Sequence, residues 1–180
     1  HAAQFGVLDD VVARHEVDQL GTQTLGQRVG QIPFLVGLTL VADQAAEADA
    51  AAYLDVVAAR RLPRDGDAER AARKAAIGEA SVAATEVPLR VARLAAKVLD
   101  LAASIASIGN RNAVSDAGTA ALLAAAAARG AALNVRINLP SLPDAHPLRA
   151  EAPARLAELD SSVTKREAEA IAAVSQRMSA

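Results

Sequence analysis

The chain has 180 residues, which suits one domain with a sizeable core, and 52% of them are hydrophobic although only 2% are aromatic. Much of the apolar fraction is alanine, the strongest helix former, so we expect a single all-α domain spanning residues 1–180. A formal net charge of −2 with interspersed charges argues against a nucleic-acid partner, and the absence of cysteine excludes disulfides and thiol catalysis.

The first third of the chain is predicted to contain a short helix and then a long one. The short helix covers residues 7–16, and three glycines and a proline weaken helix over 19–34. Helix resumes over 35–61, in one or two pieces. A turn at 62–69 follows, and Asp67 is placed to cap the next helix.

The remainder is predicted to be helical with two interruptions. A helix starting at residue 68 meets Pro88, where we expect a kink or a break near 85–87 before the pattern continues to Ile108. The later elements are a helix over 114–138, a proline-rich connector over 139–147 and a last helix over 149–178. These add up to an antiparallel up-and-down bundle of five to six helices.

The sequence also gives expectations about location and metals. The longest uncharged runs, residues 31–42 and 117–128, are too short to cross a bilayer, so no membrane partner is expected. No signal peptide is visible in the sequence, which begins at His1, and the expected location is the cytoplasm. The three histidines are scattered without metal-ligand spacing, so no metal site is expected.

The stretch IGNRNAVSD gathers polar residues between two alanine-rich helices. Gly109 suits a helix end, and Asn112 is a preferred N-cap residue for the next helix. Ser115 and Asp116 then fall in its first turn, where they satisfy free N–H groups. Capping leaves Asn110 unexplained, so the joint either serves only to end one helix and start the next, or it forms part of a catalytic site.

Three polar residues share one face of the helix after this joint. Asn134 and Asn138 are four residues apart, and Asp116 lies five whole turns before Asn134. The rise over that interval is roughly 27 Å, so Asp116 and Asn134 cannot serve one small site within one chain. They line the two ends of a long groove or belong to two different contacts. The asparagines alternatively make hydrogen bonds between helices that fix the register.

Residues Gly109–Leu139 resemble the signature of the formiminotetrahydrofolate cyclodeaminase and methenyltetrahydrofolate cyclohydrolase family. That pattern reads roughly GN-x-N-A-x-SD, an Ala/Leu helix, and GA-x-x-NV-x-INL. Upstream, DAAAYLDVVAARRLPRD (Asp49–Asp65) resembles the family's Asp-containing helix and Leu-Pro turn. AATEVPLRVARLAAKVLDLA (Ala83–Ala102) resembles its Thr-x-Val-Pro-Leu helix.

The resemblance implies an all-helical homodimer that binds a tetrahydrofolate derivative, as substrate and without a metal, in a groove near the subunit interface. It implies either cyclodeamination of 5-formiminotetrahydrofolate or hydrolysis of 5,10-methenyltetrahydrofolate, and the sequence does not choose between them. Both reactions pass through a tetrahedral carbon between two nitrogens. Both need a group that accepts a proton from the nucleophile and a donor for the departing nitrogen.

In such a site the acid–base work falls to carboxylates, because the matched segments contain neither cysteine nor histidine. Asp116 is the first choice and Asp49 the second, and partial burial would raise the pKa of such a carboxyl group. A solvated helix carboxylate is an equally good reading of Asp49. The expected substrate-binding residues are Asn110, Asn112, Ser115, Asn134, Asn138 and Arg136. Arginines 60, 61 and 136 are candidates for the glutamate tail of folate.

One segment departs from the family pattern. The family usually opens with Pro-Gly-Gly-Gly-Ser, whereas this chain has LGTQTLGQRVGQIPF within residues 19–34. The alternative hypothesis is therefore a non-catalytic helical dimer module that has lost the glycine-rich folate loop.

Overall fold

The computed structural model describes the backbone of residues 32–179 and the side chains of residues 44–179, and within these bounds it is helical without strands. The all-α prediction is confirmed. The predicted helix at 7–16 and most of the segment 19–34 lie outside the described residues. The elements in chain order are α3 (Ile32–Arg60), α4 (Asp67–Ile108), the 3₁₀ turn η3 (Arg111–Ala113), α5 (Val114–Asn138), the 3₁₀ turn η4 (Leu139–Ser141) and α6 (Pro147–Ser179).

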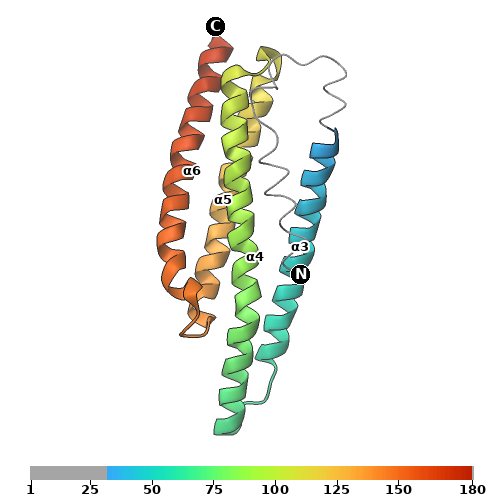
Figure 1. The fold of residues 1–180 in the computed structure, drawn as a ribbon, viewed down its shortest axis with the longest axis vertical. Helices are drawn as coiled ribbons and strands as arrows, with labels where there is room; N and C mark the ends of the chain where they lie inside the picture. The colour runs from blue at the N-terminus through green and yellow to red at the C-terminus, as the bar shows by residue number, and fades with distance from the viewer. Residues whose placement is uncertain (1–31, 180) are drawn as a thin grey trace.

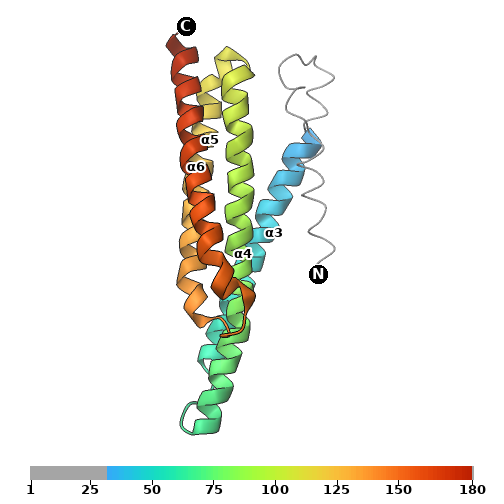
Figure 2. The same ribbon diagram turned by 60° about the vertical axis from the view of Figure 1, so that its left-hand side comes forward.

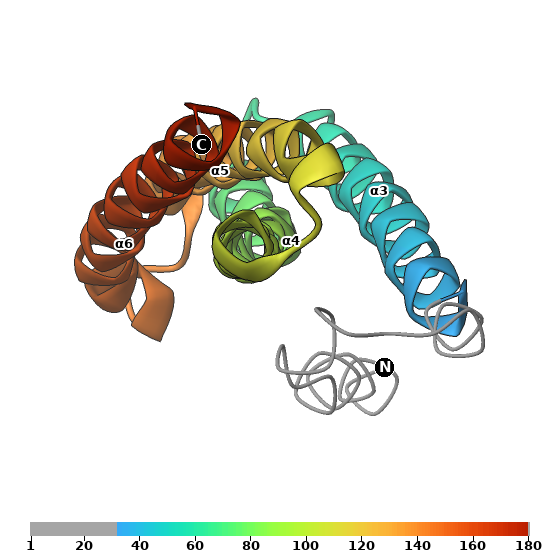
Figure 3. The same ribbon diagram turned by 90° about the horizontal axis from the view of Figure 1, so that it is seen from above.

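The four α-helices of the described region run up and down in succession (Figure 1). Helix α4 is the central element and packs against the other three, while α5 and α6 also pack against each other. Helix α3 lies along the lower part of α4 and diverges from the bundle toward its own N-terminus (Figures 2 and 3). The bundle therefore consists of a three-helix body, α4–α5–α6, with α3 attached to α4.

Helix α4 continues through Pro88, so of the kink or break predicted there, the break does not occur. A proline cannot donate a hydrogen bond to the carbonyl four residues earlier, which here belongs to Ala84. The side-chain amide of Asn138, at the end of α5, donates to that carbonyl at 2.7 Å. Because α5 supplies the missing donor, the two helices expected on either side of Pro88 form one helix of 42 residues.

Alanine fills much of the interior, and a few larger side chains divide the core along the bundle axis. Leu99 of α4 and Val163 of α6 are almost fully buried in the middle. Val135 and Leu156 lie in a second cluster near the lower end, and Val174 lies in a third near the upper end. Small residues at these positions let the helix backbones approach closely.

Residues Arg111–Ser141 are long and apolar enough to cross a membrane by length and composition alone, and 39% of the most apolar window is buried. The core helix of a water-exposed bundle passes the same test. In this fold α5 packs against α4 and α6, and Arg129 in its middle forms ion pairs with Asp160 (3.7 Å) and Glu167 (2.7 Å) of α6. These contacts are those of a helix packed inside a bundle.

Candidate functional site

The polar joint begins where α4 ends, at Ile108, as predicted. The N–H of Gly109 donates to the carbonyl of Ile105 at 2.7 Å. A Cβ atom at Gly109 would lie 2.6 Å from that same oxygen, closer than real Cβ atoms approach. Glycine is therefore required here by a close approach of backbone to backbone and not by a left-handed conformation, since its φ is −69°.

Asn110 caps the joint, not Asn112 as the sequence analysis predicted. The Asn110 side-chain oxygen accepts a hydrogen bond from the Asn112 backbone N–H at 3.0 Å. It thereby caps η3, while α5 begins behind Ala113 without a side-chain cap. The inserted 3₁₀ turn moves the capping position two residues upstream, from Asn112 to Asn110. This explains the presence of Asn110, which capping of α5 alone did not.

Arg177, near the end of α6, fastens the joint to the rest of the bundle. Its guanidinium group donates to the carbonyl oxygens of Ser107 and Gly109, the last groups of α4. A cation at a helix C-terminus satisfies free carbonyls and complements the helix dipole. The third donor of this side chain, Nε, is buried without a partner among the described residues. Arg177 thus fixes the position of the polar joint.

The polar side chains at the start of α5 face outward. Ser115 and Asp116 are exposed, and the Ser115 carbonyl accepts a hydrogen bond from the Thr119 hydroxyl at 3.0 Å. In the single chain the Asp116 carboxylate is therefore open to solvent, without partial burial. A second surface is needed to enclose this carboxylate.

The predicted residues at the other end of α5 divide into two kinds. Asn134 and Arg136 are exposed, whereas Asn138 is half-buried and its amide group is used in the hydrogen bond to Ala84. One straight helix separates Asp116 from Asn134 by roughly 27 Å. The single chain therefore brings Asn110, Asn112, Ser115 and Asp116 together, but not with Asn134, Arg136 or Asn138.

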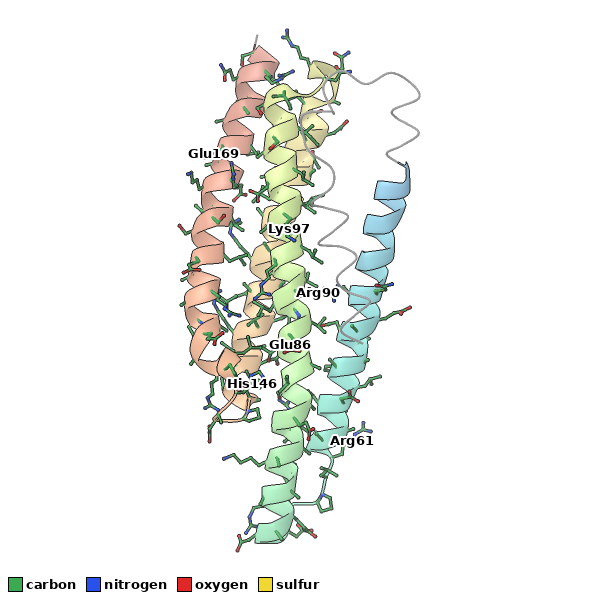
Figure 4. All side chains as sticks on the ribbon, in the orientation of Figure 1. Arg61, Glu86, Arg90, Lys97, His146 and Glu169 are labelled. Atoms are coloured by element: carbon green, nitrogen blue, oxygen red, sulfur yellow. The ribbon has the colours of Figure 1, made fainter. Side chains whose placement is uncertain are left out.

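The candidates on α3 are also exposed. Asp49 lies on an outer face of α3, and Arg60 is the last residue of that helix. Arg61 lies in the following turn and points away from the bundle (Figure 4). The Arg60 carbonyl accepts a hydrogen bond from Nε of Arg73 at 3.1 Å, which joins this turn to α4.

Elsewhere in the described region, ion pairs occur both within single helices and between helices. Arg166 of α6 contacts two carboxylates: its Nη1 lies 2.9 Å from Oε2 of Glu169, on the same helix, and its Nε lies 2.9 Å from Oδ1 of Asp100, on α4. The hydrogen bond to Glu169 and the attraction to Asp100 raise the pKa of the Arg166 guanidinium. Among the residues with described side chains, no group of three or more metal-ligating side chains is found.

Sequence reasoning missed an exposed apolar row on α5. Leu122, Leu123, Leu133 and Ile137 project from the bundle, with Leu123 67% and Ile137 75% exposed. At about 100° per residue these four positions fall within an arc of roughly 100°, so they lie along one side of the helix. The row was not recognised because α5 is apolar on both its inner and outer faces, so its sequence carries no sign of which face is buried.

A basic groove was also missed. It has a volume of about 790 Å³ and lies between the start of α4 and the segment that joins α5 to α6. Arg64, Arg70, Arg73 and Lys74 line one wall, and Arg149 lies on the other. In sequence Asp65, Asp67 and Glu69 lie among the first four, and such mixed charges are typical of a solvated helix face. Only the fold brings them opposite Arg149.

Comparison with known proteins adds an independent line of evidence. Residues 36–154 match the family model of formiminotransferase-cyclodeaminase. A methenyltetrahydrofolate cyclohydrolase of Methylorubrum extorquens is 47% identical over 112 residues, which cover 62% of this chain and 52% of that protein. The chain therefore spans about half the length of this curated relative.

Proposed function

Because the chain belongs to the formiminotransferase-cyclodeaminase family, we propose that it binds a one-carbon derivative of tetrahydrofolate and hydrolyses the methenyl bridge of 5,10-methenyltetrahydrofolate. The observation that carries the choice of reaction is the 47% identity to a protein named methenyltetrahydrofolate cyclohydrolase. The match overlaps the helices that hold Asp49 and Asp116.

The reaction adds water to the methenyl carbon between N5 and N10. Both protons leave the attacking water as its oxygen becomes the formyl carbonyl, the C–N5 bond breaks, and N5 takes up one of these protons, which yields 10-formyltetrahydrofolate. The net products are the formyl compound and one proton. The enzyme needs a base beside the water and hydrogen-bonding groups that hold the pterin ring in place.

Asp116 is our candidate for the group that accepts the proton from water and returns one to N5. It stands in the first turn of α5, beside the exposed Asn112 and Ser115. Asn110 contributes chiefly by holding the turn, since its side-chain oxygen is engaged with the Asn112 N–H. Asp49 is the second candidate for acid–base work.

A homodimer that forms through α5 would bring the candidate residues at the two ends of this helix together, each end contributed by a different subunit. The exposed face of α5 runs from Asp116 to Ile137, so a twofold axis near its midpoint sets two copies of the helix antiparallel. Asp116 of one copy then lies opposite Ile137 of the other, and Thr119 lies opposite Asn134. In this arrangement Asn134 of one subunit comes within about one helical turn of Asp116 of the other, so both subunits contribute to one pocket.

The shape of the α5 face fits this pairing. About the same midpoint, Leu123 of one copy faces Gly130 of the other. A Cβ atom added at Gly130 meets nothing within 4 Å in the single chain, so this position is open to a partner's side chain. Four large exposed apolar side chains on one helix favour a protein interface over a free surface.

Activity is tested by mixing the full chain with 5,10-methenyltetrahydrofolate and following the loss of methenyl absorbance. We expect turnover by the wild type and a fall of about 10²-fold or more in Asp116→Asn. Glu158→Gln, at an exposed site on α6, is the control and should retain full activity. Unchanged turnover in Asp116→Asn removes this carboxylate from the mechanism, and Asp49→Asn then tests the second candidate.

Absence of both folate binding and turnover in a dimeric preparation would favour the non-catalytic helical module. The family description also names cyclodeaminase, which makes cyclodeamination of 5-formiminotetrahydrofolate the second candidate reaction. Release of ammonia from that compound identifies it, since cyclohydrolysis releases none.

The dimer is tested with Gly130→Leu. The larger side chain meets free space in the single chain but fills the site that Leu123 of the second copy would occupy. We expect a monomer in sedimentation equilibrium, with subunit helicity unchanged and activity lost. Ala172→Leu, at an exposed site on α6, is the matched control. A dimeric Gly130→Leu variant would contradict pairing through this face.

A further inference from the structure

The last turns of α6 meet the polar joint at one end of the bundle (Figures 1 and 2). Arg177 donates hydrogen bonds to the carbonyl oxygens of Ser107 and Gly109, where α4 ends. Earlier on α6, the buried Val174 packs in one cluster with Val114, the first residue of α5. The end of α6 therefore contacts both helices that the joint connects.

The hydrogen bonds within the joint itself are local. The Gly109 N–H donates to the Ile105 carbonyl, four residues before it. Asn110 accepts one bond from the Asn112 N–H through its side chain and another from the Ala113 N–H through its carbonyl. Such bonds shape the turn, but they do not set its place in the bundle.

The Arg177 bonds are of a different kind, because they join residues 68 and 70 positions apart. Among hydrogen bonds between residues that the structure describes, only these two tie the joint to a distant part of the chain. They use two nitrogens of one planar guanidinium, which fixes direction as well as distance. The position of the joint relative to α6 is thus set by this one side chain.

The charge of Arg177 also complements the end of α4. The last turn of α4 contains no basic residue of its own, although the free carbonyl groups at a helix end carry partial negative charge. Arg177 brings a cation to this end from another helix, and its side chain is only partly exposed. Partial burial strengthens such a contact, since water screens it less.

We propose that Arg177 is a positioning residue for the reaction, because it sets the place of the joint and hence of Asp116. The inference rests on the proposed function, in which the Asp116 carboxylate accepts a proton from water. Any shift at the end of α4 is passed through the three-residue turn η3 to the first turn of α5, where Asp116 stands. A misplacement of about 1 Å can cost an enzyme about 10²-fold in rate. Arg177 lies beyond residues 36–154, which match the family model, so that match assigns it no role.

The test compares kcat and KM of Arg177 variants of the full chain for hydrolysis of 5,10-methenyltetrahydrofolate. Rates are measured below the unfolding transition of each variant, which circular dichroism locates. We expect Arg177→Ala to lower kcat by about tenfold or more and to raise KM by less than about threefold, because proton transfer needs closer alignment than substrate binding does. Arg177→Lys should give a kcat between those of Arg177→Ala and the wild type, since an ammonium reaches the carbonyls without the planar fork.

A destabilised control separates positioning from a general loss of stability. Leu99→Ala removes a buried side chain in the middle of the bundle, away from the joint. It should lose at least as much thermal stability as Arg177→Ala and keep the wild-type kcat. Gln176→Ala, an exposed neighbour on α6, should change neither quantity. Arg177→Gln, which should also lower kcat, serves as the second variant if Arg177→Ala folds poorly.

The outcomes distinguish this inference from the proposed function. An active wild type with an unchanged kcat in the Arg177 variants overturns this inference alone. So does an equal fall of kcat in Leu99→Ala, because the loss would then follow stability, and so does a lysine variant no better than alanine. An inactive wild type overturns the proposed function, and this inference with it.

Discussion

Replacing Asn138 with alanine removes the donor that satisfies the Ala84 carbonyl, which Pro88 leaves unpaired inside α4. The bond is partly buried and joins residues 54 positions apart. Leaving a buried carbonyl without a partner costs about 1–3 kcal/mol. For a chain of this size each kcal/mol lowers Tm by roughly 2–4 °C, so a loss of roughly 2 kcal/mol predicts a fall of about 4–8 °C. Urea unfolding followed by circular dichroism measures the free energy directly.

A double-mutant cycle tests the reason for the loss. In Pro88→Ala the backbone N–H returns and donates to the Ala84 carbonyl, so this oxygen no longer depends on Asn138. Asn138→Ala should then cost about 1–2 kcal/mol less in the Pro88→Ala background than in the wild type. Gln176→Ala, an exposed polar residue of α6, is the control and should change stability by less than about 0.5 kcal/mol. Additivity of the two changes within about 0.5 kcal/mol would refute the reasoning.

Three further substitutions test other contacts by the same unfolding measurement. Arg177→Ala should lower the free energy of unfolding by about 1–3 kcal/mol and speed hydrogen exchange at the joint, because the Ser107 and Gly109 carbonyls lose their donor. Unchanged exchange at the joint would show that Arg177 does not hold it in place. Gly118→Leu should cost about 1–3 kcal/mol by crowding Val174, and Val174→Ala should recover part of it; no recovery would place the strain elsewhere. Leu99→Ala should cost about 2–5 kcal/mol, and a smaller loss would mean that the alanine-rich core collapses around the gap.

The sequence predicted the helices well because their signals are local. The expected helix at 114–138 matches α5, and the expected ends near 61, 108 and 178 are within one residue of the observed ones. Of the kink or break predicted near Pro88, the break does not occur, because the missing donor comes from Asn138, far away in the chain. No local pattern announces that a side chain from another helix will supply the missing donor.

The candidate site was harder to predict for related reasons. The joint itself was found, since glycine, asparagine and aspartate between two apolar helices form a recognisable pattern. Its capping residue was wrong because the 3₁₀ turn that shifts the cap is too short to leave a sequence period. The basic groove depends on residues 64–74 meeting residues 140–149, and the sequence alone gives no sign of that contact.

The attachment of α3 to the bundle has a consequence for the time scale of motion. Within the described residues, α3 packs extensively against α4 alone, whereas α4, α5 and α6 all pack against one another. Such a helix opens as a separate cooperative unit, with a smaller free energy than global unfolding. Amide protons of α3 should therefore exchange with solvent well before those around Leu99, exposing one side of α4 at intervals while the three-helix body stays closed.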